Sequence, residues 1–176
     1  MSKIAVIYWP KKGSTEKAAQ NIYNKLGSEK ADIFSLSQIS PSVFNEYDFF
    51  IVGGNTVGAD NWEDAHKGER WGPFYASMKE QKISLKGKKI ALFGLGDQVR
   101  YPEHFVNDMK LLYDYFGEFQ ANFVGFWPVD GYDHTDSSAV IGDVFVGLAL
   151  DEDNQSNLTN ERIDLWLNKV VREFER

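Results

Sequence analysis

Short apolar runs alternate with segments of helical period along this chain, and that alternation limits the folds open to it more than any other feature. Five runs rich in β-branched or aromatic residues have the length of strands, at 3–8, 31–35, 48–53, 89–94 and 122–126. The centres of the third and fourth runs contain no polar residue, which is typical of strands covered on both faces. The pattern predicts an α/β fold with a parallel sheet between two layers of helices.

Three segments between or after these runs have the spacing of amphipathic helices. The first covers about 14–26 and stops at Gly27, a residue that readily adopts a left-handed conformation. The second places Phe105, Met109, Leu112 and Phe116 on one stripe, and the last places Ile163, Trp166, Leu167, Val170 and Phe174 on another, with Thr159 as N-cap. We assign the aromatic residues of these stripes, Phe105 and Trp166 among them, to the core rather than to a ligand site.

Length and composition restrict the function classes. A chain of 176 residues suits one domain, 1–176, and the absence of cysteine excludes disulfides, thiol nucleophiles and Cys-ligated metal centres. The formal net charge of −7 disfavours non-specific binding to nucleic acid; it favours solubility first and attraction to a basic partner second. Without an apolar segment of membrane-spanning length or a signal sequence, we expect a cytoplasmic monomer that does not bind membranes.

Ligands of open parallel sheets lie beyond the carboxyl ends of the strands, where the loops 9–15, 54–68 and 94–101 are expected. The first loop enters a helix N-terminus, whose free amides and dipole attract anions. Lys11 and Lys12 add positive charge, Gly13 permits close approach, and the hydroxyls follow at Ser14 and Thr15. The loop is therefore a candidate phosphate site, although a hydroxyl residue at a helix start is more often only a cap.

The loop 94–101 combines small residues that expose backbone amides with Asp97 and Tyr101. A planar heterocycle could stack on Tyr101, or the loop could be a plain turn with Tyr101 packed on the next helix. The residues alone leave both open. Other sites are easier to exclude: P-loop and dinucleotide glycine motifs are missing, and the three histidines lack metal-site spacing and are assigned to the surface.

Nearly the whole chain resembles the flavodoxin family, in particular its long-chain branch, and the C-terminal half matches it most closely. The matching strings are Gly94-Leu95-Gly96-Asp97-Gln98 with Tyr101 and Phe105, then Asp130-Gly131-Tyr132, then 145–155 ending in Asp-Glu-Asp-Asn-Gln. The resemblance implies a three-layer flavodoxin-like sandwich around a five-stranded parallel sheet of order 2-1-3-4-5. It also implies that 127–143 is the long-chain insertion in the last strand, and that the other long connection, 55–72, carries ligand contacts.

The resemblance further implies a low-potential one-electron carrier that binds non-covalent flavin mononucleotide (FMN), serves redox partner proteins and has no substrate turnover of its own. Carried over by position, the FMN phosphate is held by Pro10, Lys11, Lys12, Gly13, Ser14 and Thr15. The flavin ring is contacted by Asn55, Thr56, Val57, Gly58, Ala59, Leu95, Gly96, Asp97 and Tyr101, and the ring or ribitol by Asp153. Tyr101 is expected to stack on the outer face.

The sequence departs from the family pattern at both ends of this site. Pro10 and Lys12 replace two threonines of the hydroxyl-rich phosphate loop, and Val57 stands where most long-chain members have Trp. Trp62, in the same long connection as Val57, could replace that ring, pack on the protein or face a partner. Two alternative functions therefore remain: an FMN-dependent quinone or nitro-compound reductase, and a flavodoxin-like interaction protein that has lost FMN.

Overall fold

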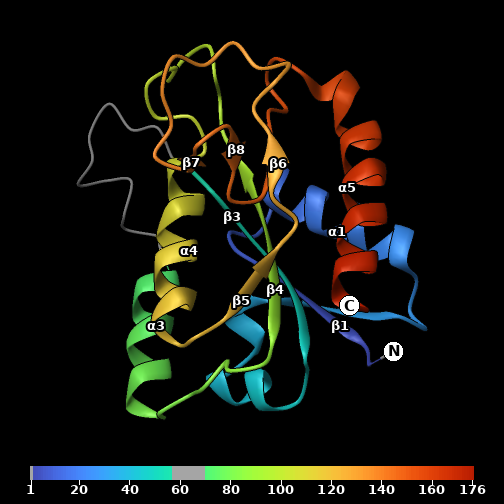
Figure 1. Ribbon diagram of the computed structural model, residues 1–176, viewed down its shortest axis with the longest axis vertical. Helices are drawn as coiled ribbons and strands as arrows, with labels where there is room; N and C mark the ends of the chain where they lie inside the picture. Colours follow the sequence, from blue (N-terminus) through green and yellow to red (C-terminus); the bar gives the residue numbers. More distant parts are fainter. Residues whose placement is uncertain (1, 57–69) are drawn as a thin grey trace.

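A parallel β-sheet runs through the centre of the molecule with helices on both faces (Figure 1). The computed structural model describes residues 2–56 and 70–176. The strands follow the order β2-β1-β3-β4-β5, and β9 pairs with the same strand as β5, further along β4. Their bounds are β1 Ile4–Tyr8, β2 Ala31–Ser35, β3 Phe49–Asn55, β4 Lys89–Leu95, β5 Asn122–Val124 and β9 Leu148–Leu150. The fold class and strand order expected from the sequence are confirmed.

The helices form the two outer layers. Helices α1 (Ser14–Leu26) and α5 (Thr159–Phe174) pack together on one face, and α3 (Trp71–Glu80) and α4 (Asn107–Glu118) cover the other (Figure 1). Short 3₁₀ turns occupy η1 Leu36–Gln38, η2 Pro41–Asn45 and η3 Ser156–Leu158. None of the helices in 2–56 and 70–176 combines the length and the apolar character needed to cross a membrane.

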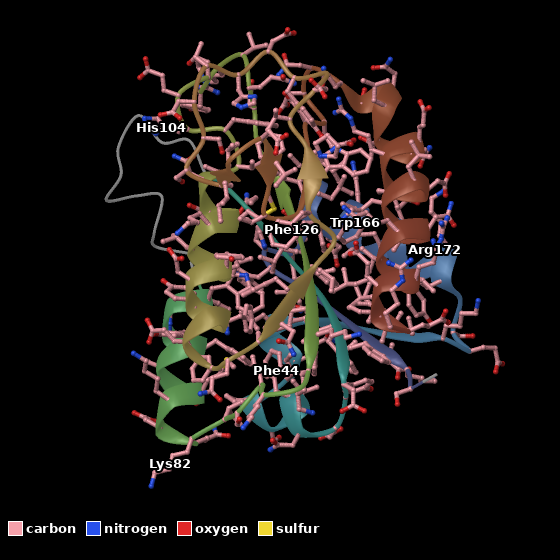
Figure 2. The ribbon with its side chains drawn as sticks, in the orientation of Figure 1. Phe44, Lys82, His104, Phe126, Trp166 and Arg172 are labelled. Carbon is pink, nitrogen blue, oxygen red and sulfur yellow. The ribbon has the colours of Figure 1, made fainter. Side chains whose placement is uncertain are left out.

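Each strand feeds two separate cores because successive side chains of a strand point to opposite faces. In β1, Ala5 and Ile7 join the core under α3 and α4, whereas Ile4 and Val6 join the core under α1 and α5. Phe44 belongs to the first core and Trp166 to the second, and both are labelled in Figure 2. This two-sided burial explains why the strands lack alternating polar residues.

The last strand position is occupied by two short strands that pair with different parts of β4. Strand β5 lies beside the start of β4 and β9 beside its end. Between them, β6 (Trp127–Pro128), β7 (Val140–Ile141) and β8 (Val144–Phe145) form a small antiparallel sheet. The expected strand 122–126 ends early, at Val124, because Gly125 has a φ of 77° and its carbonyl accepts a hydrogen bond from Trp166 Nε1.

Two expected helix starts are also wrong. Phe105 is fully buried, as predicted, but it precedes α4, since Val106 adopts a left-handed φ of 50°. Thr159 is the first residue of α5 rather than its N-cap, and its hydroxyl donates to the Glu152 carboxylate. Helix α3 was not predicted at all, because Gly72 and Pro73 in its first turn look like helix breakers in the sequence.

Gly147, which precedes β9, provides a test of this packing. A Cβ there would overlap the backbone carbonyl of Leu92 in β4, so we expect Gly147→Ala to destabilise the protein by about 1–3 kcal/mol. Gly117 in α4 is the matched control, because the nearest atom to its added Cβ is 3.9 Å away. Gly117→Ala should be neutral or stabilising by up to about 1 kcal/mol. Urea unfolding of both variants measures the difference, and equal effects would contradict the close approach of Gly147 to β4.

Candidate functional site

A cavity of about 390 Å³ opens at the carboxyl ends of the parallel strands. Its walls come from the β1–α1 loop, the end of β3, the loop after β4 and the loop after β9. The lining residues are Pro10, Lys11, Lys12, Gly13, Ser14, Thr15, Asn55, Thr56, Leu95, Gly96, Asp97, Arg100, Tyr101, Glu152 and Asp153. The position is the one expected for a ligand of an open parallel sheet.

The β1–α1 loop brings the start of α1 to one side of the cavity. Gly13 is the N-cap residue, and no side chain caps the helix from that position. Ser14 and Thr15 lie inside the first turn, so the expectation that a hydroxyl merely caps this helix is wrong. The amides of the first turn, together with Lys11 and Lys12, give this side of the cavity a positive potential suited to an anion.

Glu16, which the sequence analysis did not single out, fixes the shape of this loop. Its carboxylate accepts hydrogen bonds from the Tyr8 hydroxyl and from the Lys12 N–H, each at 2.6 Å. The hydrogen bond from Tyr8, followed by that from Lys12, lowers the pKa of the Glu16 carboxyl. Burial, followed by the same hydrogen bond, raises the pKa of Tyr8 to about 12. A Glu at the third position of a helix often accepts from the N–H of the N-cap residue, and that signal could have revealed Glu16, which here accepts from the preceding residue, Lys12.

The loop after β4 forms the opposite wall through close backbone contacts. The Gly96 N–H donates to the Leu150 carbonyl, and the Thr56 N–H donates to the Leu95 carbonyl. A Cβ on Gly96 would lie 2.9 Å from the backbone nitrogen of Val106 and 3.0 Å from the Phe105 ring. Glycine is therefore required for this loop to pass so close to the start of α4.

Asp97 organises the turn that carries Tyr101. Its carboxylate accepts from the N–H groups of Val99 and Arg100 and from the Asn154 side-chain amide. Burial opposes ionisation of Asp97, but the hydrogen bonds from Arg100, Asn154 and Val99 outweigh it and lower the pKa of the carboxyl. Tyr101 is half-buried and lines the cavity, with the Arg100 guanidinium carbon 5.4 Å from the centre of its ring.

The predicted site residues that the structure describes all line this one cavity. Val57, Gly58 and Ala59, with Trp62, lie outside the described residues. Arg100 and Glu152 also line the cavity and were missed; each adjoins a predicted residue, and only the path of its loop brings it to the wall.

His104 and His134 are the histidines that the structure describes, and His66 lies outside the described residues. In the described parts of the chain, no cluster of His, Cys, Asp and Glu could hold a metal ion. The assignment of His134 to the surface is wrong in part, because its ring packs against Phe105, Tyr132 and Phe145 and its Nδ1 is buried. Burial lowers the pKa of His134, which favours the neutral ring among these aromatic neighbours.

The cavity therefore combines two chemistries. The lysines and the α1 N-terminus suit a phosphate, whereas Leu95, Gly96 and Tyr101 offer an apolar surface and an aromatic ring to a flat group. Asp97, Glu152 and Asp153 supply acceptors for hydroxyl or N–H groups between or beside these two parts. An elongated molecule with an anionic end and a flat end would match this arrangement.

The chain is similar to several known proteins over nearly its whole length. The family model described as Flavodoxin matches residues 6–166. Flavodoxins from Synechococcus elongatus and Trichodesmium erythraeum are 35% and 38% identical over 175 residues, covering 99% of this chain and 99% of each relative. The crystal structure of Fusobacterium nucleatum flavodoxin bound to flavin mononucleotide is similar with a TM-score of 0.84 and 29% identity, covering 99% of both chains.

The lowered pKa of Asp97 predicts a specific pH dependence of stability. A carboxyl whose folded pKa lies below its ordinary value of 3.8 stabilises the fold above 3.8, and this contribution disappears as the pH falls through the folded pKa. Asp97→Asn should therefore lower the melting temperature near neutral pH, and its difference from the unmodified protein should shrink well below pH 3.8.

Asp114→Asn is the control, since the Asp114 carboxylate forms only an exposed pair with Lys110 along α4. Its effect should stay within about 1 kcal/mol at any pH. A constant difference between the Asp97 variant and the unmodified protein from neutral pH to strong acid would contradict the role of the charged Asp97.

Proposed function

The chain belongs to the flavodoxin family, and we propose that residues 1–176 form one domain that holds a non-covalent FMN in the cavity at the carboxyl edge of the sheet. The protein is an FMN-dependent electron carrier rather than an enzyme with a substrate of its own. Bound FMN supplies the one-electron chemistry, and the residues of the chain bind it, orient it and set its surroundings.

The observation that carries the assignment of the site is the two-part lining of one cavity. Its volume of about 390 Å³ lies within the range of roughly 300–1,000 Å³ that is usual for small-molecule sites. The positive end fits the phosphate, and the apolar end with Tyr101 fits the flavin ring. We assign Asp153 and Glu152, which line the same cavity, as acceptors of hydrogen bonds from ribitol hydroxyls.

The phosphate end works differently from a loop of threonines. Because Glu16 already accepts the Lys12 N–H, that amide is not spare for the phosphate. We assign the phosphate to the amides at Gly13, Ser14 and Thr15 and to the Lys11 and Lys12 side chains. Lysine is a mobile point charge, so this recognition depends on ionic strength more than fixed hydroxyl donors would.

Tyr101 favours the carrier over the reductase. If its ring covers the outer face of the flavin, a nicotinamide or quinone has no room to stack there. The edge of the flavin ring then stays available for electron transfer to a protein partner. Among the described residues, Pro10 and Lys12 are the departures that motivate the interaction protein, and none specifically favours the reductase.

We also propose the long-chain assignment and a monomer in the cytoplasm. Residues 125–147 lie between β5 and β9, which supports an insertion in the last strand; a crystal structure with a continuous fifth strand would contradict it. The large exposed hydrophobic residues described in the structure, Val99, Leu111, Ile141 and Leu165, belong to different elements and build no evident dimer face. Sedimentation velocity and cell fractionation test these two properties.

The first experiment is the visible absorption spectrum of the protein purified from cells, followed by titration of the flavin-free protein with FMN. We expect flavin absorption bands and stoichiometric quenching of FMN fluorescence. A colourless protein that leaves FMN fluorescence unchanged would favour the interaction protein instead.

The same titration tests the lysines. The double variant Lys11→Ala/Lys12→Ala should lose at least about tenfold in FMN affinity, equivalent to about 1.4 kcal/mol, and should bind riboflavin as before because riboflavin has no phosphate. The dependence of FMN affinity on salt should also flatten. Lys82→Ala/Lys86→Ala is the control, since Lys82 lies at the opposite end of the molecule from His104 of the loop after β4 (Figure 2). Equal losses for FMN and riboflavin would contradict the phosphate role.

We further propose that the redox partners dock with basic faces on the cavity end. Glu103, Asp133 and Asp153 are exposed in the loops around the cavity. Electron transfer to a basic c-type cytochrome, used as a probe, should slow with rising salt and in Glu103→Gln/Asp133→Asn. Glu29→Gln/Glu80→Gln carries the same charge change away from the cavity and should change the rate little. Equal rates in both variants would contradict the docking site.

A further inference from the structure

Asp151 is a fully buried carboxylate that lies directly after β9 and does not line the cavity. Its Oδ2 accepts from the backbone N–H and the side-chain amide of Gln98, at 3.1 and 2.8 Å. Its Oδ1 accepts from the N–H groups of Asp153 and Asn154, at 3.1 and 3.0 Å. The side-chain amide of Asn154 lies within 3.1 Å of both oxygens.

Within the described residues, every hydrogen bond to the Asp151 carboxylate comes from an N–H group. None of the ion pairs between described residues involves Asp151. A buried charge without a counterion is costly unless hydrogen bonds satisfy it, and here both oxygens are satisfied. Asp151 and its donors therefore form a tightly coupled unit, in which losing the acceptor leaves several buried donors unpaired.

The groups that donate hydrogen bonds to Asp151 belong to the loops after β4 and after β9, which form the proposed flavin-ring side of the cavity. Gln98 directly follows Asp97, and Asn154 directly follows Asp153. The Asn154 amide also donates to Asp97 Oδ1 at 2.9 Å, so one side chain joins the two carboxylates. Asp151 thus connects the loop after β4 to the loop after β9 at a point one residue behind the cavity wall.

The same unit reaches the segment between β6 and β7. Gln98 Oε1 accepts from the Asp133 N–H at 2.5 Å. The N–H groups of Thr135 and Asp136 both donate to the Pro102 carbonyl, next to Tyr101. The loop that carries Asp97 and Tyr101 is therefore supported from behind by two other loops, and Gln98 is the residue that both of them contact.

On the basis of the proposed function, we propose that Asp151 is a positioning residue for FMN. It does not contact the cofactor, but it sets how tightly the two loops on the ring side of the cavity bind the flavin. A loop outside regular secondary structure has no ladder to pair its N–H groups, so a buried acceptor decides its conformation. A loop already in its bound conformation loses less entropy when the flavin binds. Removing the acceptor frees the ring side and leaves the phosphate side unchanged.

Asp151→Asn tests this with almost no change in shape. Whichever way the new amide is oriented, its NH₂ group faces N–H groups that donate hydrogen bonds to Asp151 in the unmodified protein. Unpaired buried donors destabilise the loop arrangement. We expect affinity for FMN and for riboflavin to fall by the same factor, on the order of tenfold. The Lys11 and Lys12 variant instead reduces FMN affinity alone, so the ratio of the two affinities separates the two sides of the site.

The midpoint potential of the bound flavin gives an independent readout. Asp151→Asn removes a negative charge close to the ring side, so the potential should become more positive. Asp32→Asn is the control. Asp32 lies in β2 and accepts hydrogen bonds from Lys3 and Tyr47, so this variant should change neither flavin affinity nor potential. If Asp151→Asn fails to fold, Asn154→Ala replaces it, since Asn154 is exposed and joins Asp97 to Asp151. That variant should show a smaller loss for both flavins.

Two outcomes would overturn the inference alone: unchanged affinity and potential in Asp151→Asn while the unmodified protein binds FMN, or a loss limited to FMN. Failure of the unmodified protein to bind FMN or riboflavin would overturn the proposed function, and the positioning role with it.

Discussion

The parallel pairing of β1, β3 and β4 determines where everything else in this molecule lies. These strands are buried on both faces, so water cannot replace the hydrogen bonds between them and their register is strongly specified. Parallel strands all end at the same edge, which brings three loops distant in sequence to one cavity. The helices seal the two faces of the sheet, and the chemistry is left to that edge.

Carboxylates rather than regular ladders stabilise the loops at this edge. Glu16 accepts the Lys12 N–H in the first loop, Asp97 accepts two N–H groups in the loop after β4, and Asp151 joins that loop to the one after β9. Acidic side chains thus supply fixed hydrogen-bond acceptors to irregular backbone in all three places. These acidic side chains would also disfavour the addition of an electron to a flavin bound in the cavity, because like charges repel.

The phosphate end shows how this chain differs from the hydroxyl-rich pattern of its family. With Pro10 and Lys12 in place of threonines, the proposed phosphate site relies on amides at the start of α1 and on lysine charge. A cavity with cations at one end and carboxylates elsewhere gives an asymmetric ligand one preferred orientation.

The sequence by itself determined the sheet, most helices and the family, because apolar runs, helical spacing and the Asp-Glu-Asp-Asn-Gln string are local patterns. It also located nearly all described cavity residues, since family motifs mark loops directly. Its errors fall where tertiary contacts override local signals: Gly125 ends β5 under Trp166, and Val106 turns the chain before α4. Only the tertiary structure revealed the hydrogen bonds of Asp151, whose partner Gln98 is separated from it by 53 residues. A hydrogen bond between residues so far apart leaves no periodic trace in the sequence, because it depends on how β4 and β9 lie side by side.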